Sequence, residues 1–202
     1  MLMREQRIYS ALLAIALFFL LGSSVWALTK IVHEDFENYS LGSLGAPWSV
    51  SKSGTSQASI VSTADHGKVI LLHGGKVTDF LIASRGFSAS SQEIVAQVDI
   101  KPTTDASFIW SLHGAGSSIG ARRIRLQRQP GSPMLVSNTV PGGNRDCAAL
   151  PSGIWSRVTL KVHATLYPHT FDVLINGNRT ACTGLSTGLS PPFTQVSIMD
   201  AS

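Results

Sequence analysis

Arginine side chains gather in one short run of the sequence, and their spacing points to the binding of anions. The run contains Arg122, Arg123, Arg125 and Arg128. In an extended strand, alternate side chains point to the same face, so Arg123, Arg125 and Gln127 would lie together. Guanidinium groups form paired hydrogen bonds with carboxylates and sulfates. If this face lies in the same sheet as Arg157 and Lys161, the surface suits the uronic or sulfated sugars of an anionic polysaccharide.

A tryptophan near this run allows two interpretations. Trp110 supplies a ring on which a sugar could stack, but it alternates with Phe108 and Leu112, as a core residue does. A charged strand face is also often merely solvated. We keep both interpretations: a glycan-binding surface, or ordinary core and surface residues. The predicted surface consists of Arg123, Arg125, Arg157, Lys161 and Trp110.

The carboxylates of the sequence include no pair placed for glycoside hydrolysis. Retaining and inverting enzymes hold their two carboxyl groups about 5–5.5 Å and about 6.5–9.5 Å apart, respectively. Glu93 and Asp99 share one face of a predicted strand, but the strand rise separates them by roughly 20 Å. The 6 histidines are dispersed, without the spacing of metal ligands. We therefore expect a non-catalytic protein; an enzyme would need carboxylates that converge from different strands.

The chain contains two cysteines, Cys147 and Cys182. In an oxidising compartment an even number of cysteines is most simply explained by a disulfide, and two buried free thiols are the alternative. The bridge would close a loop of about 35 residues, worth about 3–4 kcal/mol in the chain-entropy model. We predict the disulfide.

The first residues have the three parts of a secretory signal peptide. Arg4 and Arg7 form a positive region, residues 8–21 are largely apolar, and Val25 and Ala27 occupy the small-residue positions before a cleavage point. The alternative is an uncleaved anchor, because the apolar stretch approaches the ~18–20 residues that cross a bilayer. We predict cleavage after Ala27 and a secreted, periplasmic or extracellular location. Membrane contact is expected only through this segment, if it is uncleaved.

Removal of residues 1–27 leaves residues 28–202, a length that suits one domain with a proper core. The removed segment carries Arg4, Arg7 and Glu5, so the 16 basic and 12 acidic residues become 14 and 11, and the net charge becomes +3. An excess this small and scattered argues against nucleic acid as a partner. The charged fraction of 14% and the 18 glycines suit an extracellular β protein.

Short alternating runs, separated by clusters of Gly, Pro, Ser and Asn, replace helical periodicity after residue 27. The predicted strands cover residues 30–36, 58–62, 68–73, 80–84, 93–101, 107–113, 122–128, 133–137, 157–163, 170–176 and 195–200. Val158, Leu160 and Val162, for example, oppose polar neighbours. One buried and one solvated face per strand is typical of antiparallel sheets, two of which pack face to face as a sandwich.

Several stretches resemble known extracellular jelly rolls. The first is Asp35-Phe36-Glu37 with Gly42 and Pro47-Trp48, which is similar to the opening of many bacterial secreted members. The others are residues 153–160, which open a strand with Trp155, residues 171–178, which end in an Asn-Gly turn, and the closing residues 196–200. On these stretches the chain resembles the concanavalin A-like lectin/glucanase superfamily, in particular its laminin G-like members.

The resemblance implies an all-β, two-sheet antiparallel jelly-roll sandwich over residues 28–202. It also implies a structural Ca²⁺ that ties the first strand to the last, with Glu37 and Asp200 at the matching positions and Asp35 as a helper. Calcium takes about six to eight oxygen ligands, and the alternative is that these carboxylates are merely solvated at strand ends.

The superfamily includes lectins, glycosidases, lyases and structural modules, so the fold does not by itself determine the function. We expect a secreted, non-catalytic carbohydrate-binding or surface-interaction module, whose partner is a polysaccharide or glycan. The alternatives are an atypical glycoside hydrolase or lyase and a purely structural adhesion domain.

Overall fold

The computed structural model describes most of the predicted domain. The described residues are 36–74, 79–90, 93–104, 106–114, 123–129, 131–138, 143–165, 167–187 and 192–200. Their regular elements are all β-strands, and among them no helix is long and apolar enough to cross a membrane. The predicted signal peptide, residues 1–27, and Asp35 lie outside the described residues.

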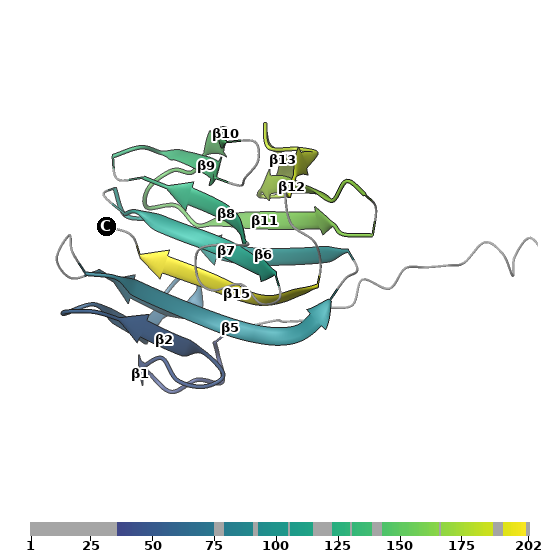
Figure 1. Cartoon of the computed structure of the whole chain (residues 1–202). Coiled ribbons are helices and arrows are strands. Elements are labelled where there is room, and N and C mark those ends of the chain that lie inside the picture. The colour runs from purple at the N-terminus through teal and green to yellow at the C-terminus, as the bar shows by residue number, and fades with distance from the viewer. Residues whose placement is uncertain are drawn as a thin grey trace, which may run out of the picture.

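The strands form three antiparallel sheets (Figure 1). The large sheet has the order β10-β9-β8-β7-β15-β5-β2. Its strands are β2 (Ser49–Lys52), β5 (Leu81–Ser90), β7 (Phe108–Gly114), β8 (Arg123–Arg128), β9 (Met134–Asn138), β10 (Asn144–Ala149) and β15 (Phe193–Asp200). The small sheet has the order β13-β12-β11-β6, with β14 paired to β12. Its strands are β6 (Ile94–Ile100), β11 (Ser156–His163), β12 (Thr170–Ile175), β13 (Asn178–Arg179) and β14 (Leu185–Ser186). The third sheet has the order β1-β3-β4. Its strands are β1 (Gly42–Ser43), β3 (Gln57–Thr63) and β4 (Gly67–His73).

The alternation along β11 shows how the sequence directs these strands. Val158 pairs with Val98 of β6 and with Ile175 of β12, and all three contribute to the core. Arg157 and Thr159 alternate with Val158 and therefore point away from the core. Because neighbours in a ladder share a face, the predicted inner and outer faces of these three strands are confirmed.

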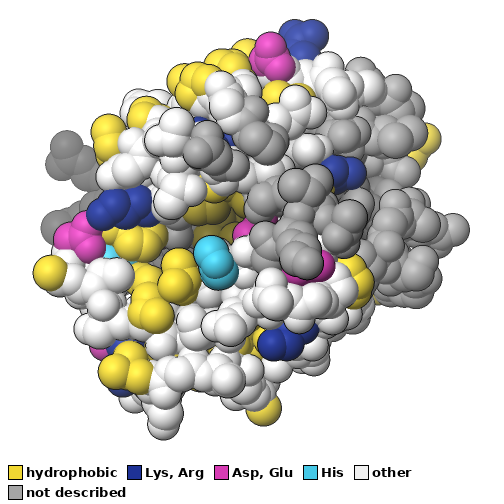
Figure 2. Space-filling view, turned by 90° about the vertical axis from the view of Figure 1, so that its left-hand side faces the viewer, with side chains coloured by type: hydrophobic (Ala, Val, Ile, Leu, Met, Phe, Trp, Pro, Cys, Tyr) yellow, Lys and Arg dark blue, Asp and Glu magenta, His cyan; other side chains and the backbone are white. Residues whose placement is uncertain are grey.

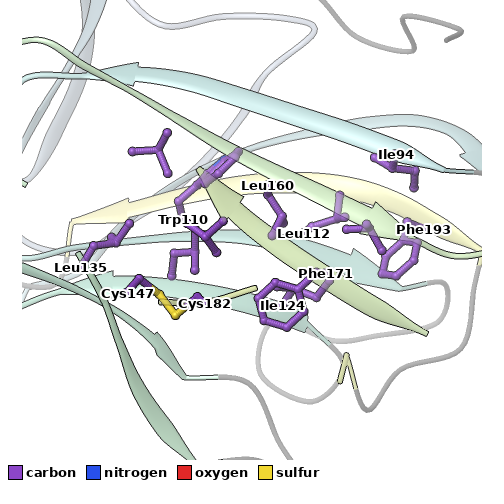
Figure 3. Packing of buried hydrophobic residues seen from close by; sticks show 14 of the residues in the cluster. Ile94, Trp110, Leu112, Ile124, Leu135, Cys147, Leu160, Phe171, Cys182 and Phe193 are labelled. Atoms are coloured by element: carbon purple, nitrogen blue, oxygen red, sulfur yellow. A yellow bond between two sulfur atoms is a disulfide. The ribbon is translucent and has the colours of Figure 1, made fainter. Parts of the chain in front are cut away.

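Two hydrophobic clusters lie on the same side of the large sheet. The main core joins the large and small sheets (Figure 3). It includes Leu112, Ile124, Leu126, Leu135, Leu160, Val162, Phe171 and Phe193. A second cluster joins β3 to β5, with Leu44, Ala58, Ile60, Leu81 and Ala83 buried in it. Both smaller sheets thus cover one face of the large sheet, and the predicted all-β jelly-roll sandwich is confirmed.

The predicted disulfide is present and connects the two layers. Cys147 of β10 and Cys182, which follows β13, are joined with an S–S distance of 2.03 Å, and both are buried (Figure 3). The backbone N–H of Ala181 also donates to the carbonyl of Cys147, at 3.0 Å. The edge strand of the large sheet is therefore fastened to the edge of the small sheet.

Some strands were not predicted, and they share a physical reason. Strands β1, β2, β10, β13 and β14 are short or lie at a sheet edge. In β10 only Cys147 is fully buried, so the sequence of this strand carries no alternation to recognise. The predicted strand over residues 30–36 lies outside the described residues except for Phe36, which is not in a strand.

Loss of the disulfide should lower the free energy of unfolding. A Cys147→Ala/Cys182→Ala variant is expected to lose about 3–4 kcal/mol, because the unfolded chain is then no longer constrained by a closed loop. Urea unfolding followed by tryptophan fluorescence measures this difference. A reducing agent should shift the wild-type midpoint in the same direction and leave that of the variant unchanged. Equal stability of the oxidised protein and the variant would contradict the prediction.

Candidate functional site

A row of paired polar residues crosses the outer face of the large sheet. Arg125 of β8 pairs with Ser111 of β7, and Ser111 pairs with Ser197 of β15. The row continues through Ser84 of β5 to Ser49 of β2. Their sequence neighbours, such as those of β7 and β8, form the main core, so these five side chains project away from it. The outer face thus carries a continuous strip of hydroxyl groups with a guanidinium at one side.

The centre of this strip is enclosed. The side chains of Ser111 and His113 are 2% and 1% exposed. The Nε2 atom of His113 and the Oγ of Ser197 form a hydrogen bond of 2.7 Å. The Oγ of Ser111 has no hydrogen-bond partner among the described residues. A buried hydroxyl left without a partner costs about 1–3 kcal/mol.

Arg125 stands beside this hydroxyl at the boundary of the enclosed region. Its side chain is half-buried, and its Nη2 donates to the Oε1 of Gln127, at 2.7 Å. Arg125 and Gln127 share the outer face, as predicted, because Ile124 and Leu126 between them are fully buried in the core. Arg123 pairs with His113 in the same ladder, and its side chain lies outside what the structure describes.

The last arginine of the run has a structural role. Arg128 lies on the inner face and is 1% exposed. Its guanidinium donates to the carbonyls of Thr103 and Ala106 and to the Oγ of Ser152, the shortest of these bonds being 2.6 Å. Arg128 therefore fastens the loop before β7 to the end of the sandwich.

The predicted binding surface is not a single surface. Arg157 and Lys161 lie on β11 in the small sheet, whereas Arg125 lies on β8 in the large sheet. The hydrophobic core separates the two outer faces. Trp110 is 6% exposed and packs in that core, so its role as a stacking residue for a ligand was predicted wrongly.

The cations of the small sheet are already paired with carboxylates. Arg157 donates to both carboxylate oxygens of Asp99, at 2.7 Å each, and Lys161 contacts Glu93 at 2.9 Å. On the side of the molecule seen in Figure 2, basic side chains stand apart from one another, and some lie next to acidic ones. The pairing of Arg157 with Asp99 and of Lys161 with Glu93 does not favour a broad anion-binding surface on the small sheet.

These pairs shift the acidity of the carboxylates. The hydrogen bonds from Arg157 lower the pKa of Asp99, and Asp99 in turn raises the pKa of Arg157. Lys101, at 3.0 Å, lowers the pKa of Asp65 in the turn between β3 and β4. Burial alone would raise the pKa of Asp172, but the hydrogen bonds from the Gly184 N–H and from His163 lower it overall.

The carboxylates of the large sheet do not form a hydrolytic pair. In the described strands of this sheet, Asp146 of the edge strand β10 pairs with Val136 of β9, and Val136 pairs in turn with Gln127 of β8. Because Gln127 lies on the outer face, Asp146 lies on that face too. Asp200 of β15 pairs with the core residue Phe108 and so belongs to the opposite face. Two carboxyl groups on opposite faces of a sheet cannot flank one glycosidic bond.

The proposed calcium ligands also lie apart. The Oε1 of Glu37 accepts the N–H of Lys68, at 2.8 Å, and the Oδ2 of Asp200 accepts the N–H of Gly74, at 2.7 Å. Lys68 and Gly74 stand at opposite ends of β4, roughly 20 Å apart by strand rise. One Ca²⁺ cannot contact both carboxylates, so the prediction of a shared site is wrong. Among the described residues, no group of three or more His, Cys, Asp or Glu could hold a metal ion.

Sequence reasoning missed a cluster at the turn between β3 and β4. The His66 ring stacks on Trp155, with centroids 4.1 Å apart, and its Nε2 lies 3.3 Å from Asp99. The Trp155 Nε1 donates to Asp65, at 2.9 Å. These partners lie far apart in sequence, and no local pattern signals such a contact.

Comparisons with known proteins bear on the fold. No protein-family model matches the chain, and no curated protein matches it. A solved sialidase structure is similar over 85% of this chain, with a TM-score of 0.68 and 13% identity. This chain covers only 15% of the sialidase. An endo-1,3-beta-glucanase from Streptomyces sioyaensis is similar over 85% of this chain and 84% of its own, with a TM-score of 0.50 and 12% identity. The β-sandwich of this chain is thus similar in fold to parts of these two structures. At these identities the likeness shows the fold alone.

The ion pair of Asp99 should make stability depend on pH. Because its folded pKa is lowered below the ordinary value of 3.8, ionised Asp99 stabilises the fold above that value and loses this effect as the pH falls through the folded pKa. Asp99→Asn is expected to lower the free energy of unfolding at neutral pH by about 1 kcal/mol or less, because Arg157 is largely exposed. Urea unfolding at a series of pH values should show the difference shrinking towards acid pH. Asp146→Asn provides a control of equal charge, and a pH-independent difference for Asp99→Asn would refute the prediction.

Proposed function

We propose that this protein is a secreted, non-catalytic carbohydrate-binding module that holds an anionic glycan on the outer face of its large sheet. The observation that carries this proposal is the register of Arg125 beside Ser111, whose buried Oγ has no hydrogen-bond partner among the described residues. A guanidinium pairs with carboxylate or sulfate, and a neighbouring hydroxyl can complete the recognition of the same group.

The spacing of the strip suits a sugar. Side chains that face each other across a ladder lie about 4.5–5.5 Å apart at Cβ, so Arg125, Ser111 and Ser197 span about 10 Å. In this arrangement the acidic substituent lies at Arg125 and Ser111.

The placement of the carboxylates on the large sheet favours binding over catalysis. The outer face of the described strands of the large sheet holds Asp146 at its edge and no second carboxylate nearby. The two solved structures described above are named as enzymes of carbohydrate chemistry, which agrees with a carbohydrate ligand. Their likeness is one of fold, so it does not transfer their reactions to this chain.

Arg125→Ala should weaken binding to an acidic polysaccharide by tenfold or more, because it removes a charge-assisted hydrogen bond worth about 1.5–3 kcal/mol. Ser111→Ala should weaken it less, because the lost bond involves a neutral hydroxyl. Isothermal titration with polygalacturonate and with a sulfated galactan measures both effects. Raising the salt concentration should also weaken binding of the wild-type protein.

Arg179→Ala is the matched control, because Arg179 is an exposed arginine of β13 in the other layer. Melting curves establish that each variant is folded. If Arg125→Ala binds as tightly as Arg179→Ala, the assigned site is wrong. If the folded wild-type protein binds neither acidic nor neutral glycans, the adhesion alternative replaces the proposed function.

A further inference from the structure

A separate cavity, shallow and open to solvent over much of its extent, lies on the outer face of the small sheet, on the other side of the core from Arg125. Its volume is about 530 Å³, within the range of about 300–1,000 Å³ that is usual for small-ligand sites. It is lined by His66, Gln97, Asp99, Trp155, Ser156, Arg157, Thr159, Asn176 and Gly177. Three separate parts of the fold thus meet here: the β3–β4 turn, the β6–β11 ladder and the turn after β12.

One wall of this cavity is aromatic and held in place. The rings of Trp155 and His66 are nearly parallel, with an interplanar angle of 14°. The Nε1 of Trp155 donates to Asp65, and Asp65 is also bound by Lys101. These contacts orient the indole before any ligand arrives, which lowers the entropy cost of binding.

Two amide side chains line the cavity, and each has one end engaged within the protein. The Nε2 of Gln97 donates to the Oγ1 of Thr159, at 3.0 Å. The Oδ1 of Asn176 accepts the backbone N–H of Arg157, at 2.8 Å. Within the described residues, these bonds leave the Gln97 Oε1 as an acceptor and the Asn176 Nδ2 as a donor. An acceptor and a donor fixed in one cavity match hydroxyl groups, which can both donate and accept.

The charges of the cavity select an uncharged ligand. Arg157 forms its two hydrogen bonds with Asp99, so this arginine already has its counter-ion, and the Nε2 of His66 lies 3.3 Å from the same carboxylate. An anionic ligand would face Asp99 and compete with it. A neutral polyol meets no such penalty, because it takes hydrogen bonds without displacing the ion pair.

We propose that this cavity is a second binding site, specific for a neutral saccharide unit. The sugar hydroxyls bond to Gln97, Asn176 and the Asp99–Arg157 pair, and an apolar face of the ring packs against the wall formed by Trp155 and His66. The inference goes beyond the proposed function, because it concerns another sheet, other residues and a ligand without charge.

The test is a titration of the full protein with cellobiose, laminaribiose and lactose, followed by NMR of the Trp155 indole N–H and the His66 ring. A saturable shift of these signals by at least one disaccharide is expected. Asn176→Asp keeps the oxygen that accepts the Arg157 N–H but removes the amide donor, and it should weaken binding at least fivefold. Gln97→Leu, a change on another strand, should also weaken disaccharide binding. This second variant tests the site if Asn176→Asp is unstable.

Arg125→Ala separates this proposal from the one above. It should leave disaccharide binding unchanged, whereas Asn176→Asp should leave the binding of polygalacturonate unchanged. Failure of all three disaccharides to shift the Trp155 and His66 signals would overturn the second site. So would a shift that persists with equal affinity in both Asn176→Asp and Gln97→Leu. Neither result bears on the anionic site, which is tested separately by the titration of Arg125→Ala with acidic polysaccharides.

Discussion

The pairing of β15 between β5 and β7 is the constraint on which the rest of this structure depends. The last strand of the chain lies at the centre of the large sheet, and its ladders with both neighbours run from Phe193 to Asp200. Its inner residue Ile198 packs against both hydrophobic clusters, and its outer residue Ser197 sits in the middle of the polar strip. A slip of one residue would exchange these two faces. The core and the candidate site are therefore set by one register.

The sandwich places two different chemistries on its two outer faces. The large sheet presents serines and Arg125 around an enclosed centre, whereas the small sheet presents carboxylates and cations paired with each other. Packed sheets lie about 10 Å apart, so the core isolates these faces from one another. A glycan with acidic groups and a neutral saccharide would accordingly be recognised at different places. This division follows from strand order alone.

A β-sandwich fold is compatible with binding, catalysis or a structural role, so the function of this protein has to be argued from its sites. Catalysis of glycoside hydrolysis requires two carboxyl groups on the same side of a bond, and the described strands of the large sheet place Asp146 and Asp200 on opposite faces. Recognition of a glycan requires fewer groups than its hydrolysis. Hydrogen bonds within the protein hold such groups in place, both at Arg125 and in the cavity beside Trp155. Binding is thus the function that we propose for the outer face of the large sheet.

Local patterns in the sequence were sufficient for the all-β fold, for the faces of β6, β11 and β12, and for the placement of Arg125 beside Gln127, because alternation is a property of each strand alone. The two cysteines likewise indicated their bridge. The tertiary structure decided that Arg157 lies in a different layer from Arg125, that Trp110 is buried, and that Glu37 and Asp200 bind opposite ends of β4. It also brought His66 to Trp155. Such relations depend on which distant strands become neighbours, and that is a property of the whole packed chain, which the spacing of residues along one strand does not contain.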